Sequence, residues 1–121
     1  MSDDGTVFDI ASSQADGIAI VAVTGEIDLT NADAFQEAVD GTTAPAVVLD
    51  LAGVTYLDSS AIRAIDRSRR RFRSEKRSFF IVSPPDTPSS WTFRVSGFDC
   101  ELVVDSVEAA LAAVGRDAPP R

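Results

Sequence analysis

The chain has 121 residues, 45% of them hydrophobic, which is enough to form one compact domain around one core. It contains no histidine and a single cysteine, so a Ser-His triad, a Cys-His pair, an internal disulfide and a histidine-based metal site are excluded. The net charge of −8 makes the protein a poor match for nucleic acid, which is bound through many lysine and arginine contacts.

Apolar runs in the chain are short. The longest uncharged run extends from Gly17 to Gly25, well below the ~20 residues that span a bilayer, and residues 1–5 lack the basic stretch of a signal peptide. We therefore expect a cytoplasmic protein with no membrane segment. We expect one domain over residues 6–115, with flexible tails at residues 1–5 and 116–121.

The first half of the chain predicts a strand pair, a helix and a buried strand. Residues 6–10 alternate like a half-buried edge strand, the segment 11–17 holds the turn residues, and residues 18–23 form a continuous apolar run typical of a central strand. A helix is expected from about residue 30 until Gly41 ends it, and a buried strand follows over residues 47–51.

The second half alternates helices and strands. Helices are expected over about 60–72, 89–95 and from 107 onward, with strands over 78–82 and 101–104. This alternation predicts an α/β fold, in which a mainly parallel sheet of four strands, plus an antiparallel edge strand at the N-terminus, is covered by about four helices.

Several apolar residues of this half have expected positions. In the helix over 60–72, Ile62, Ile65 and Phe72 recur at helical spacing and are expected to face the sheet. Trp91 and Phe93 are expected in the core, and Cys100 is most simply a small packing residue.

Two adjacent hydroxyls stand where a buried strand runs into a helix, in the sequence Asp58-Ser59-Ser60. One interpretation is an ordinary N-cap, and the other is a phosphorylation site at a helix N-terminus, where the helix dipole favours added negative charge. The only lysine, Lys76, lies more than about four helical turns from Ser59, so a Ser-Lys dyad is not expected. The sequence predicts no enzyme, no cofactor and no metal site.

Four segments, in this order along the chain, match one family pattern. They are Gly25-Glu26-Ile27-Asp28, then Val48-Leu49-Asp50-Leu51 with Val54 and Leu57, then Asp58-Ser59-Ser60, and finally Gly97-Phe98 followed by Val103 to Ala110. Together they resemble a STAS domain of the anti-sigma factor antagonist type.

The resemblance implies a phosphorylation-controlled exchange of partners. The unphosphorylated antagonist would bind an anti-sigma factor, which is a serine kinase of the histidine-kinase-like ATPase fold, and so free a sigma factor. Phosphorylation by that kinase would end the contact, and a metal-dependent serine phosphatase would restore the binding form. The implied phosphorylation site is Ser59, directly after the motif aspartate, with Ser60 as the alternative. No direct contact with nucleic acid or membrane is implied.

The sequence departs from the family pattern in two places. Ala61 replaces the usual glycine, which the helix tolerates but which adds a methyl group where a kinase backbone would approach. The segment Pro88 to Arg94 is more aromatic and polar than the aliphatic helix expected there. The alternative function is therefore a STAS scaffold or sensor module that is never phosphorylated and binds a small ligand or a larger regulatory assembly.

The predicted partner-binding residues have alternative roles in most cases. Asp58 either caps the helix or orients the serine, and Glu26 and Asp28 are either partner-binding or plain exposed loop carboxylates. Residues 63–77 carry a charge of +6 against −14 for the remainder, so their arginines either balance an acidic protein or dock an acidic patch of the partner. The full partner-binding set is Asp28, Asp58, Ser59, Ser60, Ala61, Arg63 and Arg67.

Overall fold

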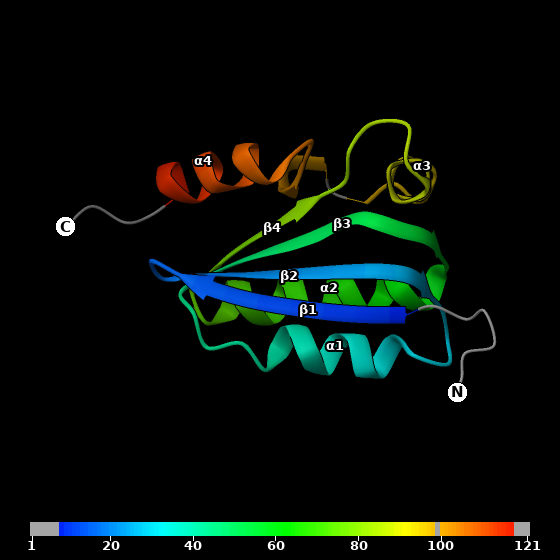
Figure 1. Cartoon of the computed structure of the whole chain (residues 1–121), viewed down its shortest axis with the longest axis horizontal. Coiled ribbons are helices and arrows are strands. Elements are labelled where there is room, and N and C mark those ends of the chain that lie inside the picture. Colours follow the sequence, from blue (N-terminus) through cyan, green and yellow to red (C-terminus); the bar gives the residue numbers. More distant parts are fainter. Residues whose placement is uncertain (1–7, 99, 118–121) are drawn as a thin grey trace.

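A five-stranded sheet forms the middle layer of the computed structural model, which describes residues 8–98 and 100–117. Helices α1 and α2 cover one face of the sheet, and α3 and α4 lie on the other (Figure 1). The strands are β1 (Phe8–Ala15), β2 (Ile18–Ile27), β3 (Ala46–Leu57), β4 (Ser78–Val82) and β5 (Val103–Val104), and the helices are α1 (Ala32–Asp40), α2 (Ser59–Ser74), α3 (Pro88–Ser96) and α4 (Val107–Asp117).

The strands lie in sequence order, β1-β2-β3-β4-β5. β1 pairs antiparallel with β2, and β2, β3, β4 and β5 pair parallel with one another. The predicted α/β fold, with a mainly parallel sheet, an antiparallel N-terminal edge strand and about four helices, is confirmed.

The N-terminal hairpin is tighter than the sequence analysis predicted. β1 continues to Ala15, which pairs with Ile18, so the turn consists of Asp16 and Gly17 alone. Their φ angles are 55° and 79°, and two consecutive positive φ values are the mark of a type I′ turn. The turn lies within residues 11–17 as predicted. The expected end of the first strand at residue 10 was wrong, because pairing with β2 overrides the low strand propensity of the small polar residues that follow.

Two clusters of buried side chains hold the layers together. The larger packs α1 and α2 against the sheet and includes Phe35, Ile65 and Phe72. The smaller lies between the sheet and α4 and includes Val48 and Ala110. β3, in the middle of the sheet, is therefore buried on both faces, which explains its continuous apolar sequence.

The length of β3 positions the junction with α2. Its register with β2 shifts opposite Thr24, where β3 has Gly53. A Cβ atom on Gly53 would lie 2.7 Å from Cγ2 of Thr24, so glycine allows the two strands to stay close through this irregularity. Beyond it the strands pair again, and Leu57 ends β3 opposite Ile27, the last residue of β2.

The later elements differ from the expected ones mainly at their ends. β4 occupies the predicted range, while α2 extends to Ser74. β5 is only two residues long because a 3₁₀ turn occupies Cys100–Leu102. α4 continues to Asp117, past the expected end of the domain at residue 115. The side chain of Cys100, and most of the predicted tails, lie outside the described residues.

The prediction that Trp91 belongs to the core was wrong. α3 buries Ser89 and Phe93, which lie one turn apart on the face toward the sheet. Trp91 and Val95 lie on the opposite face, and the Trp91 side chain is 59% exposed. Phe93 is buried as predicted, with its ring centroid 5.1 Å from that of Phe98.

Within the described part of the chain, none of the helices has both the length and the apolar character needed to cross a bilayer.

Candidate functional site

Asp58 connects the end of β3 to the start of α2 and fixes the geometry of both. Its backbone is extended, and its Oδ1 accepts hydrogen bonds from the backbone N–H groups of Ser60 at 2.9 Å and Ala61 at 3.2 Å. Its own N–H donates to the carbonyl oxygen of Ile27 at 3.2 Å, which ties the junction to the end of β2. Asp58 is therefore an N-cap residue, and its carboxylate already occupies two amides of the helix N-terminus.

The two serines of the junction differ in accessibility. Ser59, the first residue of α2, is exposed. Ser60 is buried to 9% exposure, and its Oγ lies 3.4 Å from Nη2 of Arg63, which donates to it. The hydroxyl of Ser59 is therefore more accessible from outside the protein than that of Ser60.

Ala61 does not lie on the accessible surface. Its side chain is fully buried and joins Ala64, Ile65 and Phe72 in the stripe that packs α2 into the core. The prediction that Ala61 contacts a partner is contradicted, because its methyl group points into the protein. Ile62, predicted to face the sheet, is only partly buried.

Asp28 lies at the same sheet edge as Asp58, because β2 and β3 are adjacent, parallel and end together. Its Oδ1 accepts hydrogen bonds from the Thr30 backbone N–H at 2.9 Å and the Thr30 hydroxyl at 2.5 Å. These bonds lower the pKa of the Asp28 carboxyl, with the side-chain bond from Thr30 as the largest cause. Its carbonyl oxygen accepts from the N–H groups of Asn31 and Ala32 at the start of α1, so Asp28 shapes this turn.

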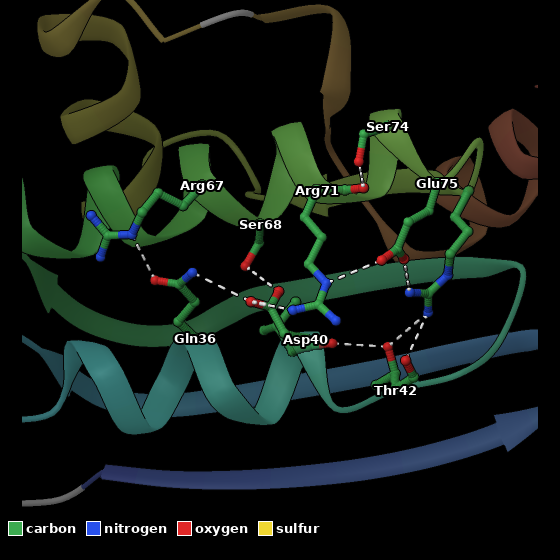
Figure 2. Close-up of polar contacts among 10 residues, drawn as sticks. Gln36, Asp40, Thr42, Arg67, Ser68, Arg71, Ser74 and Glu75 are labelled. Carbon is green, nitrogen blue, oxygen red and sulfur yellow. Dashed lines mark hydrogen bonds and ion pairs between the residues drawn. The ribbon is translucent and has the colours of Figure 1, made fainter.

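Many arginines of the positively charged segment 63–77 contact other parts of this chain. Figure 2 shows the contacts between α1 and α2: Arg67 Nε donates to Oε1 of Gln36 at 2.9 Å, and Ser68 Oγ donates to Oδ1 of Asp40 at 2.8 Å. Nη1 of Arg71 lies 3.9 Å from Oδ2 of Asp40. These side chains hold the two helices together.

Further arginines pair at the end of α2 and along its surface. Glu75 accepts from Arg71 at 3.2 Å and from Arg77 at 2.8 Å, and the hydrogen bond from Arg77 is the main cause that lowers the pKa of the Glu75 carboxyl. Arg69 and Arg70 both pair with Asp66. Much of the positive charge is thus neutralised within the protein.

A groove of about 650 Å³ opens between the start of α2 and the outer face of α3. Ser59 lies on it, together with Asp58 and Arg63 from the junction and the first turns of α2. The rest of the lining is mainly apolar and comes from the end of β3, from α2 and from α3: Tyr56, Leu57, Ile62, Pro88, Trp91, Thr92, Val95 and Ser96.

Comparison with known proteins identifies the family. A model of the STAS domain matches residues 9–111. The chain belongs to the STAS domain family. The resemblance found in the sequence is thereby confirmed. A comparison with curated protein sequences gives no match.

Solved structures similar to this STAS domain include anti-sigma factor antagonists. One from Mycobacterium paratuberculosis has a TM-score of 0.82 at 23% identity, with 94% of this chain and 99% of that chain covered. A putative one from Thermotoga maritima has a TM-score of 0.77 at 20% identity, with 88% and 95% covered. The Bacillus cell fate determinant SpoIIAA in its phosphorylated form has a TM-score of 0.66 at 14% identity, with 93% and 100% covered. At these identities the likeness shows a shared fold.

Sequence reasoning missed the apolar part of the groove in this STAS domain. Tyr56 lies in the last part of β3, where only every third residue is buried, so no simple alternation in the sequence marked it as exposed. Trp91 and Val95 are four residues apart, which places them on one face of a helix. Ser89 and Phe93 have the same spacing and lie on the other face, so the sequence could have shown that only one of the two pairs faces the sheet. Their large size favoured the core interpretation instead.

Proposed function

We propose that this STAS domain is an anti-sigma factor antagonist, and that it binds an anti-sigma factor serine kinase through the surface around Ser59. Phosphorylation at Ser59 ends the binding. The observation that carries the proposal is the exposed Ser59 on a largely apolar groove at the start of α2. The similarity of the fold to anti-sigma factor antagonists supports it.

The switch acts on binding rather than on the fold. Phosphate adds about −1.5 to −2 charges to Ser59. Because the Asp58 carboxylate already accepts from the N–H groups of Ser60 and Ala61, the phosphate does not replace a cap and stays on the exposed side of the helix. Burying such a charge unpaired in an interface costs several kcal/mol, and every 1.4 kcal/mol is tenfold in affinity. A large conformational change is not needed.

The proposed docking surface is smaller than the set predicted from sequence. Ser59 and Arg63 lie on the groove, and Arg67 follows one turn later on the exposed side of α2. Asp58 and Asp28 support this surface by holding the helix starts, and Ser60 lies beneath Arg63. A serine phosphatase restores the binding form, and the protein acts in the cytoplasm as a regulator and not as an enzyme.

A second candidate function is a sensor module that binds a small ligand and is not phosphorylated. The observation that favours it is the groove itself, whose volume of about 650 Å³ lies in the range of small-molecule sites. In that case Ser59 would be a contact residue for the ligand instead of a phosphate acceptor.

A phosphorylation assay separates the two candidates. The purified protein is incubated with ATP and each anti-sigma kinase of the same organism, and the added phosphate is located by mass spectrometry. We expect one phosphate on Ser59, none in Ser59→Ala, and normal phosphorylation of Ser59 in the matched variant Ser60→Ala. Phosphate on Ser60 alone would move the site, and no phosphate with any kinase would favour the sensor module.

Binding measurements with the same variants test the switch. Ser59→Asp should weaken kinase binding at least about tenfold while leaving the thermal midpoint nearly unchanged, since the side chain is exposed. Ser59→Ala should bind as the wild type does but remain bound when ATP is added. Tight binding by both variants in the presence of ATP would contradict the mechanism.

A further inference from the structure

Exposed apolar side chains gather beside Ser59. Five large apolar side chains are exposed among the described residues, and three of them, Tyr56, Trp91 and Val95, line the groove between α2 and α3. A soluble protein seldom exposes such residues together unless the surface has a binding partner. The groove therefore has the composition of an interface core, with a tryptophan of the kind that dominates binding energy.

The fold holds Trp91 on this outer face. Thr87 caps α3 by accepting from the N–H of Ser90 at 3.3 Å, and Gly97 ends the helix in the left-handed conformation at φ 72°. Phe93 fixes the rotation of the helix by packing into the core. The side chain of Trp91 is thus presented by a capped helix and not by a loose loop.

The groove lining carries one cationic side chain, that of Arg63, and one carboxylate, that of Asp58. Arg63 lines the groove and donates a hydrogen bond to the neutral hydroxyl of Ser60. In contrast, Arg70, further along α2, is paired with the carboxylate of Asp66. The only carboxylate in the lining, that of Asp58, accepts from two backbone N–H groups. An occupant that brings a carboxylate next to Arg63 would form a charge-assisted pair.

We propose that the groove is the docking site for a segment of the partner kinase that combines an apolar side chain, packed against Trp91, with an acidic residue, paired with Arg63. The inference rests on the proposed function and adds the chemistry of the partner's docking segment. A second copy of the chain is a poor occupant, because a net charge of −8 makes two copies repel each other. Phosphate on Ser59 would stand in the same groove and repel the acidic residue.

The test compares kinase affinities of variants that leave the core intact. Trp91→Ala should weaken binding about tenfold or more, as for a residue at the centre of an interface. Arg63→Gln should weaken it by a smaller factor and reduce its dependence on salt concentration. The matched controls are Leu111→Ala, which removes an exposed apolar side chain from α4, and Arg70→Gln, which removes an exposed arginine of α2. Both controls should bind within about twofold of the wild type.

A second readout does not depend on mutation of the groove. Trp91 is the only tryptophan in the chain, so protein labelled with fluorotryptophan gives one fluorine NMR signal from this site. The signal should shift when an unlabelled kinase saturates the protein. An unshifted signal with a bound kinase, or equal affinity of Trp91→Ala and the wild type, would overturn the inference while leaving the proposed function standing.

Two other outcomes would also be decisive. If no anti-sigma kinase of the organism binds the wild type, the proposed function fails and the inference fails with it. If sedimentation shows that the protein alone forms a dimer that Trp91→Ala abolishes, the groove is an interface between copies, and the assignment to a kinase segment is overturned.

Discussion

Replacement of Asp58 separates its role in capping from any contact with a kinase. Asp58→Ala removes the acceptor of two hydrogen bonds, at 2.9 and 3.2 Å, from the first turn of α2. Loss of an N-cap typically costs about 1 kcal/mol, which for a domain of this size lowers the thermal midpoint by about 4 °C. Asp58→Asn keeps an oxygen acceptor in the same place and removes only the charge, so it should cost a few tenths of a kcal/mol.

The two variants are compared by thermal unfolding and by kinase affinity. If Asp58 only caps the helix, Asp58→Asn should fold and bind almost as the wild type does. If its charge also contacts the kinase, Asp58→Asn should keep its stability but lose affinity. Equal stability of Asp58→Ala and the wild type would refute the capping argument, because the hydrogen bonds seen here would then contribute nothing to folding.

Three further predictions concern the structure around the site. Ala61→Gly should lower the free energy of unfolding by about 1 kcal/mol, measured by calorimetry, because it removes a buried methyl group and lowers helix propensity. Its kinase affinity should be unchanged, and tighter binding would show that the buried methyl group does hinder a partner. Gly53→Ala should lower the free energy of unfolding by about 1–3 kcal/mol in a urea titration, because the new Cβ would press on the Thr24 side chain. The additional substitution Thr24→Ser removes the methyl group that is pressed and should restore stability. An equal loss with and without Thr24→Ser would point to another cause. The pKa of Glu75 is lowered by its hydrogen bond from Arg77, so the stabilisation is present above the ordinary value of 4.5 and is lost as the pH falls below it. Glu75→Gln should therefore be less stable than the wild type at pH 7 and lose less stability between pH 6 and 3, and parallel pH curves for the two proteins would contradict this.

The sequence predicted the layered fold because its signals were local and redundant. The apolar runs that became β2, β3 and β4 were each bounded by glycine, proline or capping residues, so their order and parallel pairing followed. The Asp16-Gly17 turn was also visible in principle, since Asp-Gly is a strong signal for a two-residue hairpin. The small polar residues before it concealed the continuation of β1.

The surface around Ser59 was predicted only in part, because it depends on contacts between distant residues. The partners of Arg67 and Arg71, Gln36 and Asp40, lie about thirty residues earlier in the chain, and sequence spacing does not reveal such pairs. Burial of Ala61 was more accessible to prediction, because it shares a helical stripe with Ile65 and Phe72. A small residue such as alanine marks a buried stripe less clearly than a large apolar one, because it is also common on exposed helix faces.

The most direct measurement of the proposed switch uses protein that carries phosphoserine at position 59, introduced during synthesis so that no kinase is needed. Its affinity for the anti-sigma kinase is compared with that of the unmodified protein and of a protein with phosphoserine at position 60. We predict that phosphoserine at position 59 weakens binding by several kcal/mol, which is more than about a hundredfold, while the fold is retained by circular dichroism. Unchanged affinity in a folded protein would contradict the account.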